Sequence, residues 1–289
     1  MKRLLSMFAT MAVLMMFLLS AAYAGTGDVT VTFWGQSAFK LESGGKTILI
    51  DPWITENFAC VKYSTCATKI KVDDITKADL ILITHDHFDH VGDTHDALGK
   101  TFPAADTIAI AKRTGAIVVA EYETAQKLLA EGLPPENILN NGYGRSIGGA
   151  IDLGVIGLNG FSIVMTPAVA SATTGVATGH IITFPSGATI YHAGDTAIFG
   201  DMQMYGTFYP IDLALLPIGG AFQMDAMQAA QSLKLLRPKK AIPMHYATFP
   251  MLAPNADEFV AQAKKVAPEV EIIVLQPGGS YILQPKATQ

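Results

Sequence analysis

Histidines and aspartates crowd into residues 81–93 (ILITHDHFDHVGD), directly after an apolar run. The side chains there that can bind a metal are those of His85, Asp86, His87, Asp89 and His90. Imidazole nitrogen and carboxylate oxygen suit Zn²⁺ and similar transition metals as ligands. His85 and His87 alternate along the chain and so can point toward one metal. Asp89 and His90 begin the next segment and can turn toward a second metal, so the pattern predicts two adjacent sites; a polar surface loop is the alternative.

Two more candidate ligands follow expected strands later in the chain. Asp195 comes directly after one strand, and the neighbouring Gly194 permits a close approach of the backbone. His245 follows another strand, although a lone histidine at such a point is more often structural. His192 lies inside its strand, where packing or supporting hydrogen bonds are expected, and His95 is expected to be solvated at a helix start.

The elements that must position these side chains are short strands that alternate with helices. Strands are expected at residues 29–35, 38–43, 46–50, 78–84, 116–120, 161–166, 180–184, 188–193, 212–217 and 240–244, and helices at 106–113, 124–131, 201–205, 225–236 and 257–266. Asp225 is expected to cap the helix 225–236. Strands inside, helices outside and the lack of a low-complexity linker predict one layered α/β domain over residues 25–289.

Residues 1–24 have the composition of a secretory signal peptide. Lys2 and Arg3 precede the apolar run 11–19, and small residues follow up to Ala24. We expect cleavage after Ala24, a periplasmic or secreted mature protein, and no stable membrane insertion. An uncleaved anchor is the alternative, but the apolar run is shorter than the roughly 20 residues that a span needs.

The expected mature chain is acidic. Removing Lys2 and Arg3 from the 20 basic residues leaves 18 against 25 acidic ones, a net charge of −7. Because no basic stripe is visible, we expect a small-molecule substrate rather than nucleic acid as the partner, and a homo-oligomer stays open. Cys60 and Cys66 are the two cysteines of the chain, and in an oxidising compartment they predict a disulfide. A thiolate metal site is the alternative for this pair.

Six motifs resemble the metallo-β-lactamase superfamily in its branch of metal-dependent hydrolases, namely residues 48–54 (ILIDPWI), 84–93 (THDHFDHVGD), 166–172 (TPAVASA), 191–202 (YHAGDTAIFGDM), 213–222 (LALLPIGGAF) and 242–250 (IPMHYATFP). The chain is similar there to the ascorbate-6-phosphate lactonase-like and phospholipase-D-like members. The resemblance implies an αββα four-layer sandwich with the metals at one edge of the two sheets. It also implies that Asp195 bridges both metals and that His245 binds the second. The implied cofactor is one or two Zn²⁺, with Mn²⁺ or another divalent metal as the alternative.

The chain departs from the family's motifs at position 170. The resemblance implies a third histidine for the first metal there, but Ala170 offers only a methyl group. The first metal would keep His85, His87 and Asp195, whereas a catalytic zinc needs about three protein ligands plus water. His180 can replace the missing ligand from a neighbouring strand end, or it can fill the pocket wall in place of an aromatic residue. The sequence leaves open whether the alanine is natural or introduced.

These observations predict an exported hydrolase that uses a metal-bound hydroxide on a lactone or a phosphodiester, with activity reduced by Ala170. Asp89 would orient the attacking water, and Tyr246 would stabilise developing oxyanion charge unless it is a core tyrosine. The alternative is a catalytically impaired metal- or ligand-binding protein on the same fold. Gly220 and Gln223 depart from the family's acidic and hydroxyl residues, which we expect to alter the substrate pocket.

Overall fold

The computed structural model describes residues 27–55, 70–92 and 105–284. The expected signal peptide (residues 1–24), the two cysteines Cys60 and Cys66, and His95 lie outside the described residues. Within the described part of the chain, no helix is both long and apolar enough to cross a membrane.

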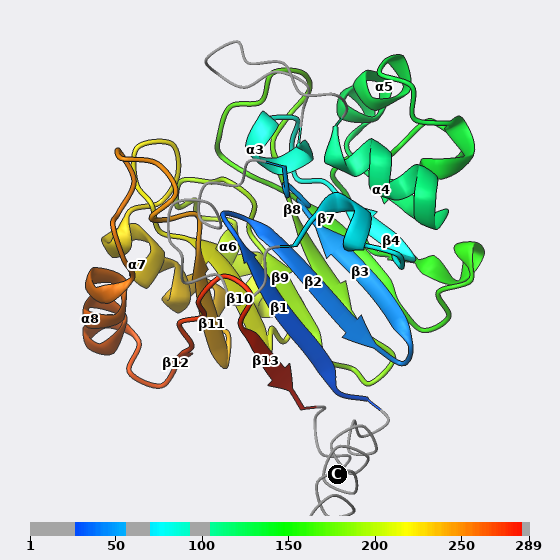
Figure 1. Cartoon of the computed structure of the whole chain (residues 1–289). Coiled ribbons are helices and arrows are strands. Elements are labelled where there is room, and N and C mark those ends of the chain that lie inside the picture. Colours follow the sequence, from blue (N-terminus) through cyan, green and yellow to red (C-terminus); the bar gives the residue numbers. More distant parts are fainter. Residues whose placement is uncertain (1–26, 56–69, 93–104, 285–289) are drawn as a thin grey trace, which may run out of the picture.

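Two mixed sheets face each other (Figure 1). The first sheet has the order β13-β1-β2-β3-β4-β5, with β1 Val29–Gly35, β2 Ala38–Ser43, β3 Lys46–Ile50, β4 Leu80–Leu82, β5 Ile117–Val119 and β13 Ser280–Leu283. The second has the order β12-β11-β10-β9-β8-β7-β6, with β6 Ile151–Asp152, β7 Ser162–Pro167, β8 Thr178–Thr183, β9 Thr189–His192, β10 Leu213–Pro217, β11 Lys240–Met244 and β12 Glu271–Ile272. The sequence did not predict the short edge strands β6, β12 and β13.

Helices lie against the outer faces of the two sheets. They are α3 Phe88–Val91, α4 Asp106–Thr114, α5 Tyr122–Ala130, α6 Met202–Phe208, α7 Ala226–Leu236 and α8 Asp257–Val266, with short 3₁₀ turns at Val72–Asp74, Pro135–Asn137 and Leu153–Ile156. The carboxylate of Asp225 accepts a hydrogen bond from the Gln228 N–H at the start of α7, so the expected cap is present.

The hydrophobic core explains why several strands are apolar without interruption. In β4, Leu80 and Leu82 pack between the two sheets, whereas Ile81 faces the layer of α4 and α5. In β10, Leu215 packs between the sheets and Leu216 faces the layer of α6, α7 and α8. Because both faces of each strand are covered, neither face is polar. The αββα four-layer sandwich expected from the sequence is confirmed.

The direction of the strands brings distant residues to one edge. β1 and β3 both pair antiparallel with β2, and β3 pairs parallel with β4, so the carboxyl ends of β1, β3 and β4 lie on the same side. In the other sheet β9, β10 and β11 are parallel. Loops that leave the carboxyl ends of parallel strands are the usual place for a binding site in such folds. Gln36, Asp51 and His85 leave the first sheet there, and Asp195 and His245 leave the second.

Candidate metal centre

Five buried side chains form two overlapping groups of potential metal ligands. One group consists of His85, His90 and Asp195, and the other of Asp89, His90 and His245, with ligand atoms of each group within 4.8 Å of one another. The first three residues of segment 85–90 leave β4 and the last three lie in α3, which begins at Phe88. A strand end followed at once by one helical turn therefore lets a six-residue segment contribute to both groups. The H-x-H-x-D-H pattern predicts His85 with His87 and Asp89 with His90, whereas His90 belongs to both groups and His87 to neither.

Asp195 lies between the two groups. Its Oδ2 is 3.2 Å from His245 Nε2, and its Oδ1 is 3.5 Å from His90 Nε2. The backbone turns there at Gly194, which has a φ of +63° and lies against the carbonyl oxygen of Thr178, where a Cβ would collide. This position therefore requires glycine, and the close approach expected from the sequence is present.

A buried carboxylate fixes the proton of His90. Asp51 Oδ2 lies 2.7 Å from His90 Nδ1, and because a carboxylate only accepts, Nδ1 carries the hydrogen. Thr84 donates its N–H and its hydroxyl hydrogen to the two oxygens of Asp51, at 2.8 and 2.6 Å. His90 Nε2 is then the nitrogen that faces Asp195. A carboxylate behind the far nitrogen of a histidine is the usual support of a metal ligand.

His85 is held by the same threonine. Since the Thr84 hydroxyl donates its hydrogen to Asp51, it can only accept from His85 Nδ1, 3.1 Å away. The lone pair of His85 is then on Nε2, which points toward His87 Nδ1, 2.9 Å away. Burial, together with the charge of His90, lowers the pKa of His85 to about 3, and burial also lowers the pKa of His87. Both rings are therefore neutral near pH 7, the form that binds a metal.

The other group is surrounded by amides and carboxylates. Gln36 donates from Nε2 to Asp89 Oδ2 at 2.7 Å, and the same nitrogen lies 2.9 Å from His245 Nε2. The backbone also joins these residues, because His245 N–H donates to the Gln36 carbonyl at 2.7 Å. On the other side of the ring, Gln223 Nε2 lies 2.7 Å from His245 Nδ1. His245 thus has a polar side chain beside each ring nitrogen.

Positive and negative side chains stabilise each other in this group. Burial opposes the imidazolium form of His245, but the carboxylates of Asp195 and Asp89 outweigh it and raise its pKa to about 9. Burial likewise opposes the charge on Asp195, yet His245 and His90 hold the pKa of that carboxyl well below its usual range. A dense set of carboxylates that needs positive charge is the electrostatic setting of a cation site.

The residues present fit a divalent metal. His90 Nε2 and Asp195 Oδ1 are buried and lie 3.5 Å from each other, and neither makes a well-formed hydrogen bond within the described part of the chain. A buried acid and a buried imidazole held apart in this way leave a position that a cation can occupy. Each group contains two imidazoles and one carboxylate, which are typical ligands of Zn²⁺, and Mn²⁺ accepts the same ligands.

His180 lies apart from both groups. The strand begins at Thr178, two residues earlier than expected, so His180 lies inside β8 opposite His192 rather than at a strand end. Its Nε2 lies 3.0 Å from the carbonyl oxygen of Ile83, and burial lowers its pKa to about 4. The structure therefore does not bring His180 together with the other candidate ligands.

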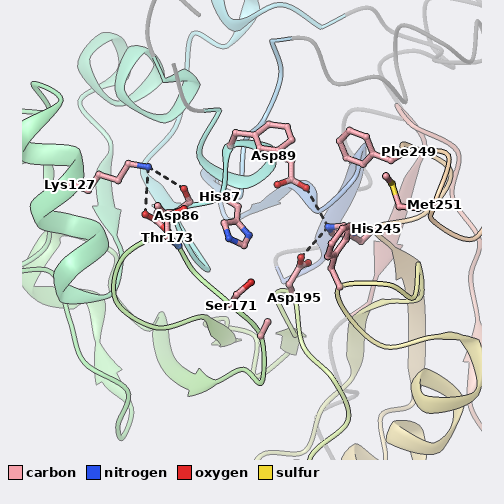
Figure 2. A pocket seen from close by; sticks show the side chains of 13 residues that line it. Asp86, His87, Asp89, Lys127, Ser171, Thr173, Asp195, His245, Phe249 and Met251 are labelled. Atoms are coloured by element: carbon pink, nitrogen blue, oxygen red, sulfur yellow. Dashed lines mark hydrogen bonds and ion pairs between the residues drawn. The ribbon is translucent and has the colours of Figure 1, made fainter. Parts of the chain in front are cut away.

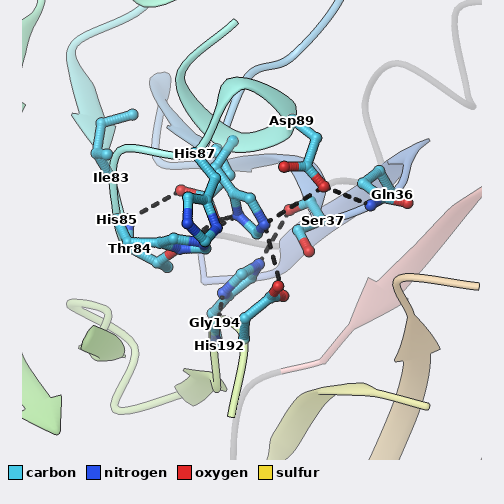
Figure 3. A network of polar contacts seen from close by, with 12 residues as sticks. Gln36, Ser37, Ile83, Thr84, His85, His87, Asp89, His192 and Gly194 are labelled. Carbon is cyan, nitrogen blue, oxygen red and sulfur yellow. Dashed lines mark hydrogen bonds and ion pairs between the residues drawn. The ribbon is translucent and has the colours of Figure 1, made fainter. Parts of the chain in front are cut away.

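Tyr246 and His192 belong to neither group of potential ligands. Tyr246 packs half-buried against the core below α6, α7 and α8, and burial raises its pKa to about 12. Its side chain is not among those that line the pocket over the ligands. His192 lies under the centre, with Nε2 3.0 Å from the Ser37 carbonyl and Nδ1 accepting from the Gly194 N–H (Figure 3).

A pocket of about 540 Å³ opens over the ligands (Figure 2). It is lined by Asp86, His87, Phe88, Asp89, Lys127, Ala170, Ser171, Thr173, Asp195, Phe222, His245, Phe249 and Met251. Asp86 turns away from the ligands, since its carboxylate accepts from the N–H of Thr173 at 2.7 Å and lies 3.5 Å from Lys127 Nζ. Ala170 belongs to the pocket wall, so the side chain at this position faces the same space as His87.

The sequence interpretation missed the residues that support the ligands. Gln36 and Asp51 follow β1 and β3, so their position at strand ends could have indicated a role in the site. Their backbone conformation could not be predicted from residue type. Gln36, Asp51 and His245 all have positive φ, at +53°, +43° and +57°, which is uncommon for residues other than glycine. Non-glycine residues keep such a conformation only where their surroundings enforce it, which is common at functional sites.

Comparison with known proteins identifies the family. Residues 46–246 match the family model described as the beta-lactamase superfamily domain. A UPF0173 metal-dependent hydrolase of Nitratidesulfovibrio vulgaris strain DP4 is 42% identical over 253 residues, which cover 88% of this chain and 95% of that protein. The chain belongs to the metallo-β-lactamase superfamily. Within it, the relatives are metal-dependent hydrolases, so this chain is a metal-dependent hydrolase that uses a divalent metal.

Two archaeal proteins extend the comparison. A UPF0173 metal-dependent hydrolase of Pyrobaculum arsenaticum is 38% identical over 248 residues, 86% of this chain and 97% of that protein. Among solved structures, Igni18, a metallo hydrolase from Ignicoccus hospitalis, has 36% sequence identity and a TM-score of 0.74, and the match covers 90% of this chain and all of that one. Because these matches span nearly the whole of each relative, the likeness concerns the complete domain.

Proposed function

We propose that the chain hydrolyses a small-molecule lactone or phosphodiester at the centre formed by His85, His87, Asp89, His90, Asp195 and His245. The observation that carries the proposal is the convergence of two groups of potential ligands, His85, His90 and Asp195 and Asp89, His90 and His245, beside a pocket of about 540 Å³ that Asp89, Asp195 and His245 line. A divalent metal, when bound, lowers the pKa of a water molecule and polarises the bond under attack. We further propose Zn²⁺ as this metal, with Mn²⁺ as the alternative.

The side chains of the centre have distinct tasks in this proposal. Asp51 keeps the hydrogen of His90 on Nδ1, so that Nε2 is always presented to the centre. Asp195 places one oxygen beside His90 and the other beside His245, so that one carboxylate reaches both groups. Asp89 lies at the pocket surface, where its second oxygen can orient the attacking water. Tyr246 is not among the side chains that line the pocket, so we do not assign it the stabilisation of oxyanion charge.

We also propose that the protein is exported. The support is the composition of residues 1–24, in which basic residues, a short apolar run and small residues follow one another. Mass spectrometry of the protein recovered from its source would detect an N-terminus at Gly25. An intact N-terminus at Met1 in the recovered protein would overturn export with cleavage.

Metal analysis combined with a substrate panel tests the activity. The metal-free protein should take up Zn²⁺ or Mn²⁺ and then hydrolyse members of a panel of lactones, phosphodiesters and a β-lactam. His85→Ala, His87→Ala and His245→Ala should each lower metal content and turnover together. Full turnover in all three variants would overturn the assignment of the centre.

A second candidate function is a metal- or ligand-binding protein without turnover. Ala170 favours it, because the pocket wall beside His87 then lacks a donor. Weak uptake of a single metal without hydrolysis of any panel member would support this candidate. Two bound metals with turnover would exclude it.

A further inference from the structure

We propose that the substrate of this pocket carries an apolar group, an acyl chain or an aromatic ring, next to the bond that is hydrolysed. This inference rests on the proposed hydrolysis and specifies its substrate class. It comes from the unequal walls of the pocket (Figure 2). We call Phe88, Phe222, Phe249 and Met251 the apolar wall, and Asp86, Lys127, Ser171 and Thr173 the polar wall. Phe249 and Met251 lie on the His245 side of the ligands, and Lys127 lies on the opposite side.

The inner part of the apolar wall is a fixed aromatic cluster. The buried Trp53 lies stacked on Phe249, with ring centroids 6.1 Å apart and planes at 11°. Phe88 meets Trp53 edge-to-face at 5.7 Å and Phe249 at 6.2 Å. Each ring has two aromatic neighbours in a favourable arrangement, so this surface exists before a substrate arrives.

The outer part of the apolar wall stands on two loops that are tied together. Ala253 N–H donates to the carbonyl of Gly219 at 2.9 Å, which joins the loop after β11 to the loop after β10. In the latter loop, Met224 N–H donates to the Thr196 carbonyl at 2.8 Å, and the Met224 side chain is fully buried. Phe222 therefore projects from an anchored turn rather than from a loose segment.

Exposure is what makes this wall unusual. The side chains of Phe222 and Met251 are 65% and 58% exposed, although both line the pocket. Large apolar side chains that gather at the mouth of a pocket mark a binding surface more often than single exposed ones do. An apolar group of a substrate would remove both from water, and methionine adapts its shape to such a partner.

The polar wall does not offer an equivalent site for a charged group. Lys127 Nζ donates to the Asp86 carbonyl at 3.2 Å and lies 3.5 Å from the Asp86 carboxylate, so its charge is balanced within the wall. Asp86 in turn accepts from the N–H groups of Thr173 and Thr174. Because Lys127, Asp86 and the two threonines satisfy one another, this wall has no surplus positive charge for a phosphate group. The geometry therefore favours esters and phosphodiesters that carry an apolar group over lactones of sugar phosphates, which carry none.

A chain-length series tests the inference. We expect kcat/KM of the Zn²⁺-loaded protein for 4-nitrophenyl acetate, butyrate, hexanoate and octanoate, corrected for spontaneous hydrolysis, to rise about two- to fourfold per methylene group. The double variant Phe222→Ser/Met251→Ser should lower the octanoate-to-acetate ratio by about tenfold or more. Val155→Ser, which changes an 84% exposed valine distant in sequence from the pocket loops, is the matched control and should leave the ratio unchanged. A flat series in the unmodified protein, or a double variant with an unchanged ratio, overturns the inference.

Binding measurements separate this inference from the proposed function. If the loaded protein hydrolyses none of these esters or the wider panel, hydrolysis fails as the function. The inference is then tested by calorimetric titration with acetate, butyrate, hexanoate and octanoate. Affinity that rises with chain length, and loses this dependence in the double variant, supports an apolar subsite. Equal affinities for all four carboxylates overturn it.

Discussion

Asp195 lies between His87 and His85 on one side, called the His87 side, and Asp89 and His245 on the other, called the His245 side. The two sides differ in how many hydrogen bonds orient their residues. On the His245 side, the Gln36 amide contacts both Asp89 and His245, and Gln223 lies beside the other nitrogen of the His245 ring. On the His87 side, Thr84 and Asp51 hold His85 and His90, but the His87 ring contacts His85, and the wall residue facing the same space is Ala170. His87 is also only half-buried, whereas His245 is 2% exposed.

This difference suggests an order of metal binding. Supporting hydrogen bonds orient a ligand before the metal arrives, and removing them typically lowers metal affinity by about 10–100-fold. The His245 side has this support within the described residues, so it should bind the first metal. The His87 side should bind its metal more weakly, because a donor is missing and fewer contacts orient the ring.

The largest effect is expected for Asp195→Asn, because this residue serves both sides. The amide removes the negative charge that faces His90 and His245, so affinity for Zn²⁺ should fall by at least about 100-fold on both sides. Calorimetric titration measures this change. Asp201→Asn, which neutralises an exposed carboxylate at the start of α6, is the control. Loss of only one of the two binding events would show that Asp195 is not shared.

Ala170→His should sharpen the comparison by strengthening the weak side. A histidine in the wall beside His87 adds a nitrogen donor, so the weaker Zn²⁺ binding event should tighten by about tenfold or more, while the stronger one stays unchanged. Val169→His places the same side chain one residue earlier, at an exposed position outside the pocket lining, and should have no effect. Tightening of the stronger event instead would assign Ala170 to the wrong side.

Gln36→Leu should weaken the strong side alone. The variant removes the hydrogen bond to Asp89 while it keeps a side chain of similar size, so the first binding event should weaken by about 10–100-fold. Gln126→Leu serves as the control, because it removes a hydrogen bond from α5 to the Gly142 carbonyl, away from the ligands. Equal Zn²⁺ affinity of Gln36→Leu and the unmodified protein would remove the physical basis of the comparison.

The smallest effect concerns a carboxyl group beneath the wall on the His87 side. Glu121 lies against Gly175 in the loop that carries Ser171 and Thr173. Burial, a hydrogen bond with Glu123 and the Glu123 charge raise the pKa of Glu121 to about 7. A raised pKa means that the protonated form stabilises the fold, a contribution present below about pH 4.5 and lost as the pH rises through 7.

Thermal unfolding at pH 5 and pH 8 measures this contribution. The Tm of the unmodified protein should fall by about 2–4 °C more over this interval than that of Glu121→Gln. Glu136→Gln, at an exposed position in the turn Pro135–Asn137, is the control and should behave like the unmodified protein. An identical pH dependence of Glu121→Gln and the unmodified protein would contradict the raised pKa.

The sequence was sufficient for the layers, and it named the five residues that form the two groups, although their binding of a metal stays a prediction. His85, His87, Asp89 and His90 follow an apolar run at short spacing, so the local sequence alone indicates that they leave a buried strand close together. The uninterrupted apolar strands predicted a sheet covered on both faces, as β4 and β10 show. Both signals depend on side-chain type and period, which a single sequence contains.

The supporting residues could not be predicted in the same way. Gln36 reaches Asp89 across 53 positions and His245 across 209, contacts that no spacing rule connects. The sequence predicts a strand that begins at His180, but β8 begins at Thr178. This difference of two residues moves His180 from the end of the strand into its interior. Long-range contacts and strand boundaries are set by packing rather than by local pattern.

The most direct test of the unequal centre is anomalous X-ray scattering from crystals of the metal-free protein soaked with less than one equivalent of Zn²⁺. The account predicts a single strong peak beside Asp89, His245 and Asp195, with a second peak next to His85 and His87 only at higher Zn²⁺ concentration. A first peak beside His85 and His87, or two peaks of equal height from the start, would contradict it.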